Sequence, residues 1–336
     1  MKKSLLSILS CPVSKEDLTL YVDEKDIDTS NDEILIGSLI SKDTKNKYHI
    51  NNCIPRFVSS DNYARSFGFQ WNKFARIQLD SYSNQLISFK RFWGSTGWDL
   101  SDLKDKWILD AGSGSGRFAE IALKAGANVV AIDYSSAIDS CSENLRKFPN
   151  FHPIQADIYS LPFKSESFDF IYSLGVLQHT PNVGKAFNSL LPFLKHQGSI
   201  CVDFYEKRYA SMIHPKYILR YLTVPIPHEV LFKILERIVP VILKINLILR
   251  TIPLIGIYLT RLIPVADYRK MHSLTNEEAT ELALLDTFDW LSAKYDNPQT
   301  IKSIKKFIQY SNLEKVHIFR KGHLILRAQK ASNTII

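Results

Sequence analysis

A short run of glycines separates an apolar stretch from an amphipathic stretch near the middle of the chain. Trp107–Ala111 is apolar except for Asp110, and Gly112, Gly114 and Gly116 follow with one residue between each. Glycine permits a tight turn and lets a ligand approach the backbone closely, and the N-terminus of a following helix offers free N–H groups. The pattern therefore predicts a ligand-binding loop between a buried strand and a helix.

Acidic residues end the next two apolar runs. Asp133 closes Asn128–Asp133, and Asp157 directly follows Ile154–Ala156. The carboxyl ends of parallel strands face the ligand crevice of an open α/β sheet. There Asp133 can accept hydrogen bonds from two ribose hydroxyls, and Asp157 can accept one from an adenine amino group. We therefore expect a ligand that contains a nucleoside.

The acid before the glycines distinguishes this loop from a dinucleotide-binding loop. The spacing here is Asp-x-Gly-x-Gly-x-Gly, whereas the dinucleotide fingerprint is Gly-x-Gly-x-x-Gly without that acid. A negative charge at Asp110 suits a cationic ligand and would repel a pyrophosphate. The loop is therefore interpreted as a site for a positively charged nucleoside.

Three runs, in this order, carry a resemblance to a known family: LDAGSGSGRFAEIALKAGANVVAIDYS, QADIYSLPF and SFDFIYSLGVLQHTPN. The chain resembles a class I S-adenosylmethionine (SAM)-dependent methyltransferase. The resemblance implies SAM as cofactor and S-adenosylhomocysteine as product, and no cluster with metal-ligand spacing lies near these runs. The family's cofactor-binding residues correspond here to Asp110, Gly112, Gly114, Gly116, Asp133, Tyr134, Asp157, Ile158, Ser173 and Leu174. The alternative, turn glycines and strand-end acids without a ligand, explains neither the order nor the spacing of the motifs.

The same resemblance implies an α/β fold with a Rossmann-like sheet of seven strands, six parallel and one antiparallel. A small β-rich ribbon-like domain is expected at the N-terminus, and a mostly helical insertion after the fifth strand is expected to act as a lid or substrate domain. Five domains are expected in chain order: a degenerate zinc-ribbon-like domain (1–60), an aromatic helical cap (61–100), the SAM-binding core (101–205), the helical insertion (206–297), and the last helix with a β-hairpin (298–330).

One histidine is placed for proton transfer. The methyl group of a sulfonium is already activated, so the enzyme mainly holds a nucleophile about 3 Å from it and excludes water. A base helps when that nucleophile is a hydroxyl. His179, in the GVLQHTP run after the expected fourth strand, is the candidate base, because histidine can take up a proton near neutral pH. The alternative is a structural histidine that fixes the loop.

Aromatic residues surround the expected core. Rings in the YARSFGFQWNKFARIQLDSY stretch (63–82) either cover the sulfonium, since aromatic faces attract cations, or pack as a stripe on the core. The same two interpretations stay open for the aromatic residues of LLDTFDWLSAKYDNPQT (284–300). The expected substrate or cap residues are Phe67, Trp71, Gln178, Trp290 and Tyr295.

The N-terminal segment resembles the zinc ribbon that precedes the core in a bacterial subgroup of these enzymes. In that alignment Cys11 keeps a ligand position, and the other three positions hold Ser14, Ser41 and Thr44. Neutral hydroxyls are poor zinc ligands, so we expect a ribbon without metal. The alternative is a lipoprotein signal ending at Cys11, but the preceding Ser4–Ser10 is short and SAM chemistry indicates a cytoplasmic protein. Four cysteines without a disulfide framework agree with that compartment.

Charge and hydropathy leave the partners open. The net charge is +8, with 42 Lys plus Arg against 34 Asp plus Glu, but the basic residues are scattered, which makes a nucleic-acid partner unlikely. Residues 229–264 are basic and apolar, without an uncharged run of about 18 residues that could span a membrane. They could lie on the inner membrane surface, in a lid or in a dimer interface.

The leading hypothesis is methyl transfer to a small-molecule, sugar-nucleotide or lipid-linked glycan acceptor. RNA or protein methylation is one alternative, and a SAM-binding partner protein without transferase activity is another.

Overall fold

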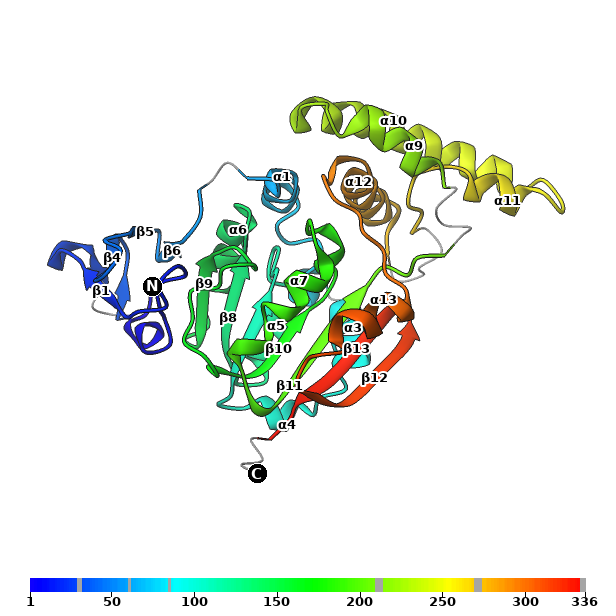
Figure 1. The fold of residues 1–336 in the computed structure, drawn as a ribbon. Coiled ribbons are helices and arrows are strands. Elements are labelled where there is room, and N and C mark those ends of the chain that lie inside the picture. The colour runs from blue at the N-terminus through cyan, green and yellow to red at the C-terminus, as the bar shows by residue number, and fades with distance from the viewer. Residues whose placement is uncertain (29–31, 60–61, 84–85, 209–213, 269–273, 333–336) are drawn as a thin grey trace. The chain divides into compact units, whose positions relative to one another are not determined.

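The chain divides into two units in the computed structural model, which describes residues 1–28, 32–59, 62–83, 86–208, 214–268 and 274–332. The core unit comprises Met1–Glu206 and Tyr295–Ile336, and the helical unit comprises Lys207–Lys294 (Figure 1).

An eleven-stranded mixed sheet runs through the core unit (Figure 1). Its strands, in spatial order, are β1 (Leu18–Tyr21), β4 (Gly37–Ser41), β5 (Lys47–Asn51), β6 (Ile54–Arg56), β9 (Phe151–Gln155), β8 (Asn128–Asp133), β7 (Trp107–Ala111), β10 (Phe168–Ser173), β11 (Leu194–Phe204), β13 (His323–Lys330) and β12 (Leu313–Lys321). A separate pair is formed by β2 (Ile27–Asp28) and β3 (Glu33–Ile34).

The part of the sheet from β9 to β12 has the seven strands expected from the sequence. Strands β9, β8, β7, β10 and β11 are parallel to one another, and β13 is antiparallel to β11. Because β12 is antiparallel to β13, it has the same direction as the five parallel strands. The prediction of seven strands was nevertheless wrong for the sheet as a whole. Strand β6 of the N-terminal segment pairs in parallel with β9 through Arg56 and Gln155, which joins four further strands to its edge.

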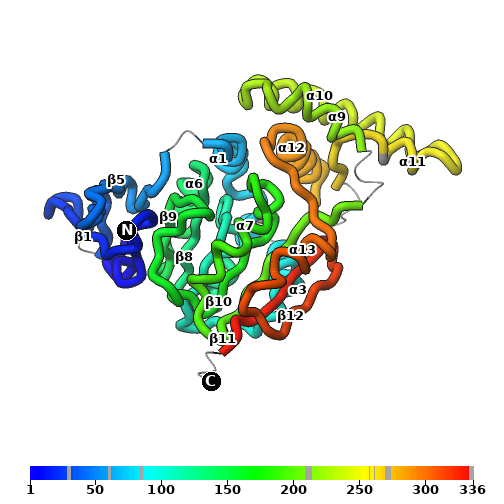
Figure 2. Tube along the Cα trace, viewed as in Figure 1, coloured from blue at the N-terminus to red at the C-terminus, as the bar shows by residue number. Residues whose placement is uncertain are grey.

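Alternate side chains of the central strands enter two hydrophobic layers, one on each face of the sheet. In β7, Leu109 belongs to one layer and Ile108 to the other. The helices of the Leu109 layer are α7 (Val183–Asn188) and α13 (Ile301–Ile308). Those of the Ile108 layer are α3 (Ile87–Thr96), α5 (Ala119–Lys124) and α6 (Ala137–Leu145), and Figure 2 shows the chain passing between strands and helices. This two-sided coverage explains why the central strands are apolar throughout.

The N-terminal segment packs on the core sheet. Leu5, Leu9, Leu39 and Ile50 are fully buried in the same layer as Leu109. A 3-10 helix, η1 (Lys3–Ser7), precedes β1. The segment is therefore held by apolar contacts with the sheet as well as by strand pairing.

Hydrogen-bonding side chains occupy the positions that align with zinc ligands. Cys11 Sγ lies 3.4 Å from the Tyr48 hydroxyl and 3.9 Å from Thr44 Oγ1, and the hydroxyls of Ser14 and Ser41 are 3.4 Å apart. Across the described ranges, no group of three or more His, Cys, Asp or Glu side chains is placed to hold a metal ion.

The described residues of the helical unit form four helices: α9 (Pro215–Thr223), α10 (His228–Arg250), α11 (Gly256–Arg261) and α12 (Asn276–Ser292). A capping box between Thr275 and Glu278 begins α12, and the Arg220 guanidinium donates to the carbonyls of Trp290 and Ala293 near its end, at 2.7 and 2.6 Å. Helices α9 and α10 both pack on α12. None of the described helices is long and apolar enough to cross a membrane.

Candidate cofactor site

The glycine loop joins β7 to the turn before α5. Gly112 and Gly116 have φ angles of +92° and +93°, a region that side chains disfavour. A Cβ atom at Gly112 would lie 2.4 Å from Val176, and one at Gly116 would lie 2.6 Å from Leu145. Backbone conformation and close packing therefore both require glycine here, and the loop passes directly over the carboxyl end of the sheet.

Asp110 lies in β7, one residue before the sharp turn of the glycine loop, and is 1% exposed. Burial raises the pKa of its carboxyl to about 8, although the neighbouring Tyr172 hydroxyl opposes this shift. A carboxyl with this pKa is mostly protonated at neutral pH in the free chain. A cation bound near it would favour the ionised form.

Asp133, at the carboxyl end of β8, is already engaged with the chain. Its Oδ1 accepts from the Ser135 N–H and hydroxyl at 2.8 and 2.7 Å, and its Oδ2 accepts from the Gly114 N–H at 3.0 Å. Burial raises the pKa of Asp133, and these three donors oppose the rise. Since a carboxylate offers about four lone pairs, the chain leaves about one for a ligand rather than the two that the ribose interpretation used.

Two tyrosines lie beside Asp157, which follows β9. The Asp157 Oδ1 accepts from the Tyr159 N–H at 2.9 Å. Burial, and then the charge of Asp157, raise the pKa of Tyr63 and of Tyr134. The rings of Tyr63 and Tyr134 are 4.9 Å apart, and those of Tyr63 and Tyr295 are 5.4 Å apart in an edge-to-face arrangement. Tyr63, which the sequence analysis did not select, therefore joins Tyr134 and Asp157 at this end of the site.

Helix α1 (Arg65–Lys73) covers the glycine loop. A Cβ atom at Gly114 would lie 3.2 Å from the Trp71 indole ring, and one at Gly68 would lie 2.4 Å from the Ser136 hydroxyl. The Gln70 Oε1 and the Ser66 hydroxyl are buried and form no hydrogen bond with any residue of the described ranges. Trp71 thus contacts the loop itself, and two buried acceptors on the same helix are left for a ligand.

His179 has its ring orientation set by a backbone carbonyl. It lies in the 3-10 helix η3 (Leu177–His179), is 8% exposed, and its Nδ1 is 3.0 Å from the Tyr295 carbonyl oxygen. A carbonyl oxygen only accepts, so Nδ1 carries the proton and Nε2 of the neutral ring has the lone pair. The rings of Phe67 and Tyr205 lie 5.0 and 5.5 Å away. The histidine is therefore held in the tautomer that a base at Nε2 requires.

Gln178 has a buried amide that lacks partners. It is 0% exposed, and neither its Nε2 nor its Oε1 hydrogen-bonds with a residue that the structure describes. Its backbone carbonyl accepts from the Asn297 N–H at 2.8 Å. An unsatisfied buried amide costs about 1–3 kcal/mol, so this side chain is a candidate ligand contact.

The remaining residues expected at the site are hydrogen-bonded to, or packed against, other parts of the fold. The Ser173 hydroxyl donates to the Ala111 carbonyl at 2.7 Å and so ties β10 to β7. Leu174 is buried in the layer that contains Ile108, and Ile158 is buried in the layer that contains Leu109. Trp290 belongs to the helical unit, where its ring lies 6.2 Å from that of His214.

A buried ion pair beside η3 was not expected from the sequence. Asp203, 1% exposed in β11, accepts from Arg91 Nη2 at 2.7 Å and from the Gly175 N–H at 2.5 Å. Burial raises the pKa of Asp203, but Arg91 and His323 outweigh this effect and lower it below its ordinary value. The pair fixes the loop that leads to Gln178 and His179. The only sequence signal was an acid at the end of the fifth strand.

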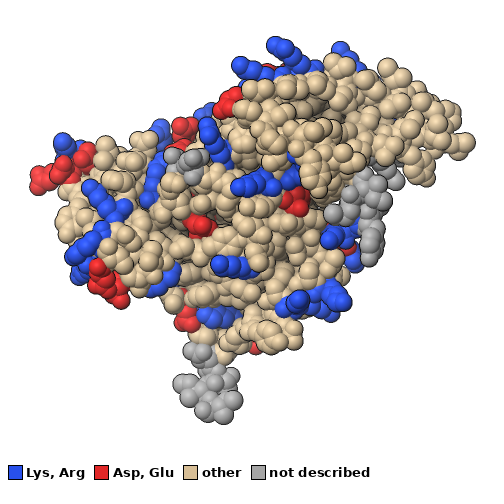
Figure 3. All heavy atoms as spheres, turned by 45° about the horizontal axis from the view of Figure 1, so that its top comes forward, with Lys and Arg blue, Asp and Glu red and all other residues tan. Residues whose placement is uncertain are grey.

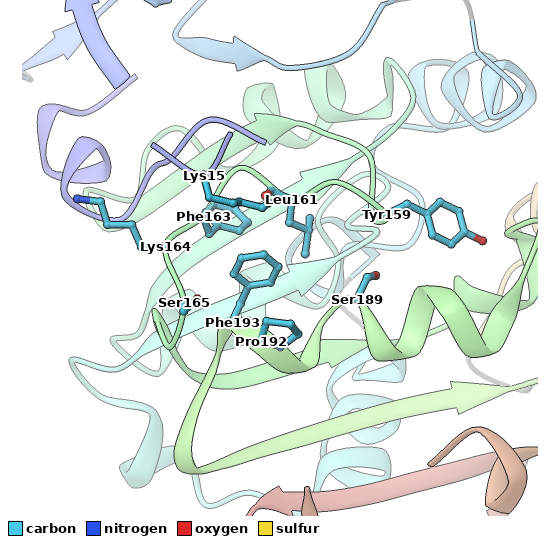
Figure 4. A pocket seen from close by; sticks show the side chains of 9 residues that line it. All are labelled: Lys15, Tyr159, Leu161, Phe163, Lys164, Ser165, Ser189, Pro192 and Phe193. Atoms are coloured by element: carbon cyan, nitrogen blue, oxygen red, sulfur yellow. Dashed lines mark hydrogen bonds between the residues drawn. The ribbon is translucent and has the colours of Figure 1, made fainter. Parts of the chain in front are cut away.

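A separate pocket of about 400 Å³ lies between the N-terminal segment and the loops around β10 (Figure 4). Its lining residues are Lys15, Tyr159, Leu161, Phe163, Lys164, Ser165, Ser189, Pro192 and Phe193. None of them is an expected cofactor or substrate residue. Lys15 also donates to the Leu161 carbonyl at 2.9 Å, so part of the lining is already paired.

Comparison with known proteins identifies the central part of the chain. The family model described as "Methyltransferase domain" matches residues 109–202, a range that includes every expected cofactor-binding residue and His179. Residues 109–202 are thus similar to a methyltransferase domain.

The curated relatives resemble only part of the chain. Phosphoethanolamine N-methyltransferase 2 of Caenorhabditis elegans is 29% identical over 158 residues, which are 45% of this chain and 33% of that protein. The tRNA U34 carboxymethyltransferase of Ruthia magnifica subsp. Calyptogena magnifica is 26% identical over 109 residues, 31% of this chain and 34% of that protein. The chain spans from about a third to about half of the length of the curated relatives it matches.

Among solved structures, a SAM-dependent methyltransferase from Aquifex aeolicus aligns with a TM-score of 0.38 and 11% identity. The alignment covers 81% of this chain and 95% of that one.

Proposed function

We propose that the chain transfers a methyl group from SAM to a small-molecule, sugar-nucleotide or lipid-linked glycan acceptor. The observation that carries this proposal is the arrangement of three acids and one glycine loop. Asp110 and Asp133 belong to the adjacent parallel strands β7 and β8, and Asp157 lies two residues after the end of β9, which is parallel to β8. A crevice at the carboxyl ends of such strands is where open α/β sheets bind nucleosides.

The residues present fit SAM. The Asp157 carboxylate with Tyr63 and Tyr134 suits the adenine, the remaining lone pair of Asp133 suits a ribose hydroxyl, and the glycine loop permits close approach of the amino-acid part. Bound SAM would supply a methyl group activated by its sulfonium. The ionisable Asp110, buried at the start of the loop, favours a positively charged ligand over a phosphate.

The chain's own groups supply positioning, exclusion of water and a base. Helix α1 places Trp71 against Gly114 of the loop and Phe67 against His179, and these rings would help to keep water from the site. The Tyr295 carbonyl keeps the proton on Nδ1 of His179, so that Nε2 can take a proton from an acceptor hydroxyl. The unpaired amide of Gln178 can donate and accept one hydrogen bond each and so orient the acceptor.

The N-terminal segment is interpreted as a zinc ribbon that lost its metal. The four aligned positions lie together, but Ser14, Ser41 and Thr44 offer hydroxyls that bond to neighbouring groups, and Cys11 bonds to Tyr48. Apolar packing on the core sheet replaces the stabilising effect of a metal. A methyltransferase that uses SAM, with its described cysteines free, is expected in the cytoplasm.

The proposal is tested with the full chain and methyl-labelled SAM. Label is followed into the lipid, metabolite, RNA and protein fractions of an extract, with the Asp133→Asn variant as control for transfer through this site. We expect label in the metabolite or lipid fraction with the unaltered chain and at least tenfold less with the variant. Label in RNA or protein would contradict the acceptor class. Binding of SAM without label in any fraction would contradict transfer itself.

A further inference from the structure

Helix α10 carries apolar residues on two adjacent faces, one buried and one exposed. Leu231, Phe232, Leu235, Val239 and Leu243 are buried, and the helix packs on α12. A second apolar stripe is exposed, by 48% at Val230, 40% at Ile234, 43% at Ile238, 55% at Val241, 44% at Ile245 and 66% at Ile248. At 3.6 residues per turn, these six side chains fall within an arc of about 80°. About half of the surface of these side chains remains open to solvent.

The exposed apolar surface continues beyond this helix. Ile252, Leu254 and Ile255 follow it directly, with exposures of 37%, 91% and 56%, and Tyr258 and Leu262 are exposed by 63% and 60%. Figure 3 shows the helical unit presenting a broad uncharged surface, with Lys and Arg side chains along its upper margin. Monomeric soluble proteins rarely expose contiguous apolar surface of this kind unless it has a binding partner.

Three basic side chains follow one edge of the apolar stripe. Lys233, Arg237 and Lys244 are exposed and fall in the arc of about 40° next to Val230 and Ile248. None of the three forms an ion pair with a described residue, whereas Arg250 of the same helix is paired with Asp267 at 3.0 Å. The acids Glu229 and Glu236 lie beyond the basic residues, away from the apolar stripe. The surface is therefore apolar in the middle and positive along one margin.

We propose that this α10 face, defined as the six exposed apolar residues with Lys233, Arg237 and Lys244, docks on a bilayer surface that contains anionic phospholipids. Apolar side chains of an interfacial helix enter the boundary between headgroups and acyl chains, and flanking Lys and Arg extend their charged ends to the phosphates. Since α10 is not apolar enough to span a membrane, it would lie in the plane of the surface.

Charge complementarity favours lipid over a second copy of the chain. If two copies packed through the apolar stripe, the basic residues of each would lack acidic partners on the other copy, because Glu229 and Glu236 lie on the far side of the basic residues. Anionic headgroups supply that negative charge at once. Docking requires neither SAM nor an acceptor, so its failure and the failure of the proposed function are separate results.

The test is co-sedimentation of the full chain with vesicles. Vesicles of phosphatidylcholine alone are compared with vesicles that contain about 30% phosphatidylglycerol, at low salt and at about 1 M salt, where charge is screened within roughly 3 Å. The test variant is Lys233→Gln/Arg237→Gln/Lys244→Gln. The matched control is Lys302→Gln/Lys305→Gln/Lys306→Gln, which removes the same charge from three exposed lysines of α13 in the core unit. A second variant, Ile234→Ser/Ile238→Ser/Ile245→Ser, removes apolar surface.

We expect the unaltered chain to bind the anionic vesicles at low salt and to dissociate from them at high salt. Each Lys or Arg near such a surface strengthens binding about fivefold, so the test variant should bind on the order of 100-fold more weakly. The control should stay within about threefold of the unaltered chain, because its lysines would not lie at the membrane. The serine variant should lose binding while it keeps the circular dichroism spectrum of the unaltered chain.

Three results would overturn the proposal. One is no binding of the unaltered chain to anionic vesicles, and another is equal loss of binding in the test and control variants. The third is a dimer in sedimentation velocity that the serine substitutions dissociate, without vesicle binding, which would assign the face to a second copy.

Discussion

Replacement of Asp110 by asparagine should make the free protein more stable and its ligand binding weaker. The carboxyl of Asp110 is buried in β7, and burial raises its pKa from 3.8 to about 8. Because the folded-state value is the higher one, the folded chain keeps a proton that the unfolded chain releases between about pH 4 and pH 8. The free energy of unfolding therefore falls as the pH rises through this window.

The size of the effect follows from the shift. The interval from 3.8 to about 8 corresponds to at most about 6 kcal/mol, at about 1.4 kcal/mol for each pH unit. Asparagine has a similar shape and does not ionise. The free energy of unfolding of Asp110→Asn should therefore exceed that of the unaltered chain by up to ~6 kcal/mol above pH 8 and by less than ~2 kcal/mol at pH 5. The proposed cationic ligand would offset this cost when it binds.

Urea unfolding at pH 5, 7 and 9 measures the difference, with Asp43→Asn, which alters an exposed acid, as the control. The advantage of Asp110→Asn should grow with pH, and the control should show no such trend. Titration with SAM should show at least tenfold weaker binding to Asp110→Asn. A variant that is less stable than the unaltered chain at all three pH values would refute the reasoning, since it would mean that the buried charge is stabilised within the free chain.

Three further substitutions test neighbouring groups. His179→Gln should lower kcat by about 100-fold or more and leave S-adenosylhomocysteine affinity unchanged, as expected for a base; an equal loss of affinity would indicate a structural role. Gln178→Met removes an amide without partners, so unfolding should cost about 1 kcal/mol more while the KM for the acceptor rises; a fall in stability would show that the amide is already satisfied. Arg91→Met leaves the buried Asp203 unpaired, so thermal unfolding should show a loss of about 3 kcal/mol, largest above the unfolded-state pKa of the carboxyl and smaller in acid; a loss independent of pH would contradict the ion pair.

Much of the core fold could be predicted from local patterns. The glycine loop, the apolar runs and their closing acids each lie within a few residues of one another in sequence, and the carboxyl-end rule then places Asp133 and Asp157 at one edge of the sheet. The structure has Asp133 at the end of β8 and Asp157 just beyond the end of the adjacent β9, while their roles toward a ligand remain predictions. Cys11 and Thr44 also lie together, as an alignment with a ribbon implies.

The parts that could not be predicted depend on contacts between distant segments. Pairing of β6 with β9 brings Arg56 beside Gln155 and enlarges the sheet, but the sequence around each of these residues does not indicate which distant strand it pairs with. Tyr63 and Tyr295 contact each other across most of the chain length. The hydrogen bonds that occupy Asp133 could not be predicted either, because Ser135 and the Gly114 N–H come within reach of the carboxylate only in the folded loop.

Titration with S-adenosylhomocysteine by calorimetry tests the central claim most directly. The account predicts binding at one site per chain, at least tenfold weaker in Asp133→Asn and in Asp157→Asn, where the variants keep the circular dichroism spectrum of the unaltered chain. An absence of binding by the unaltered chain, or binding that neither substitution weakens, would contradict a SAM site at the glycine loop.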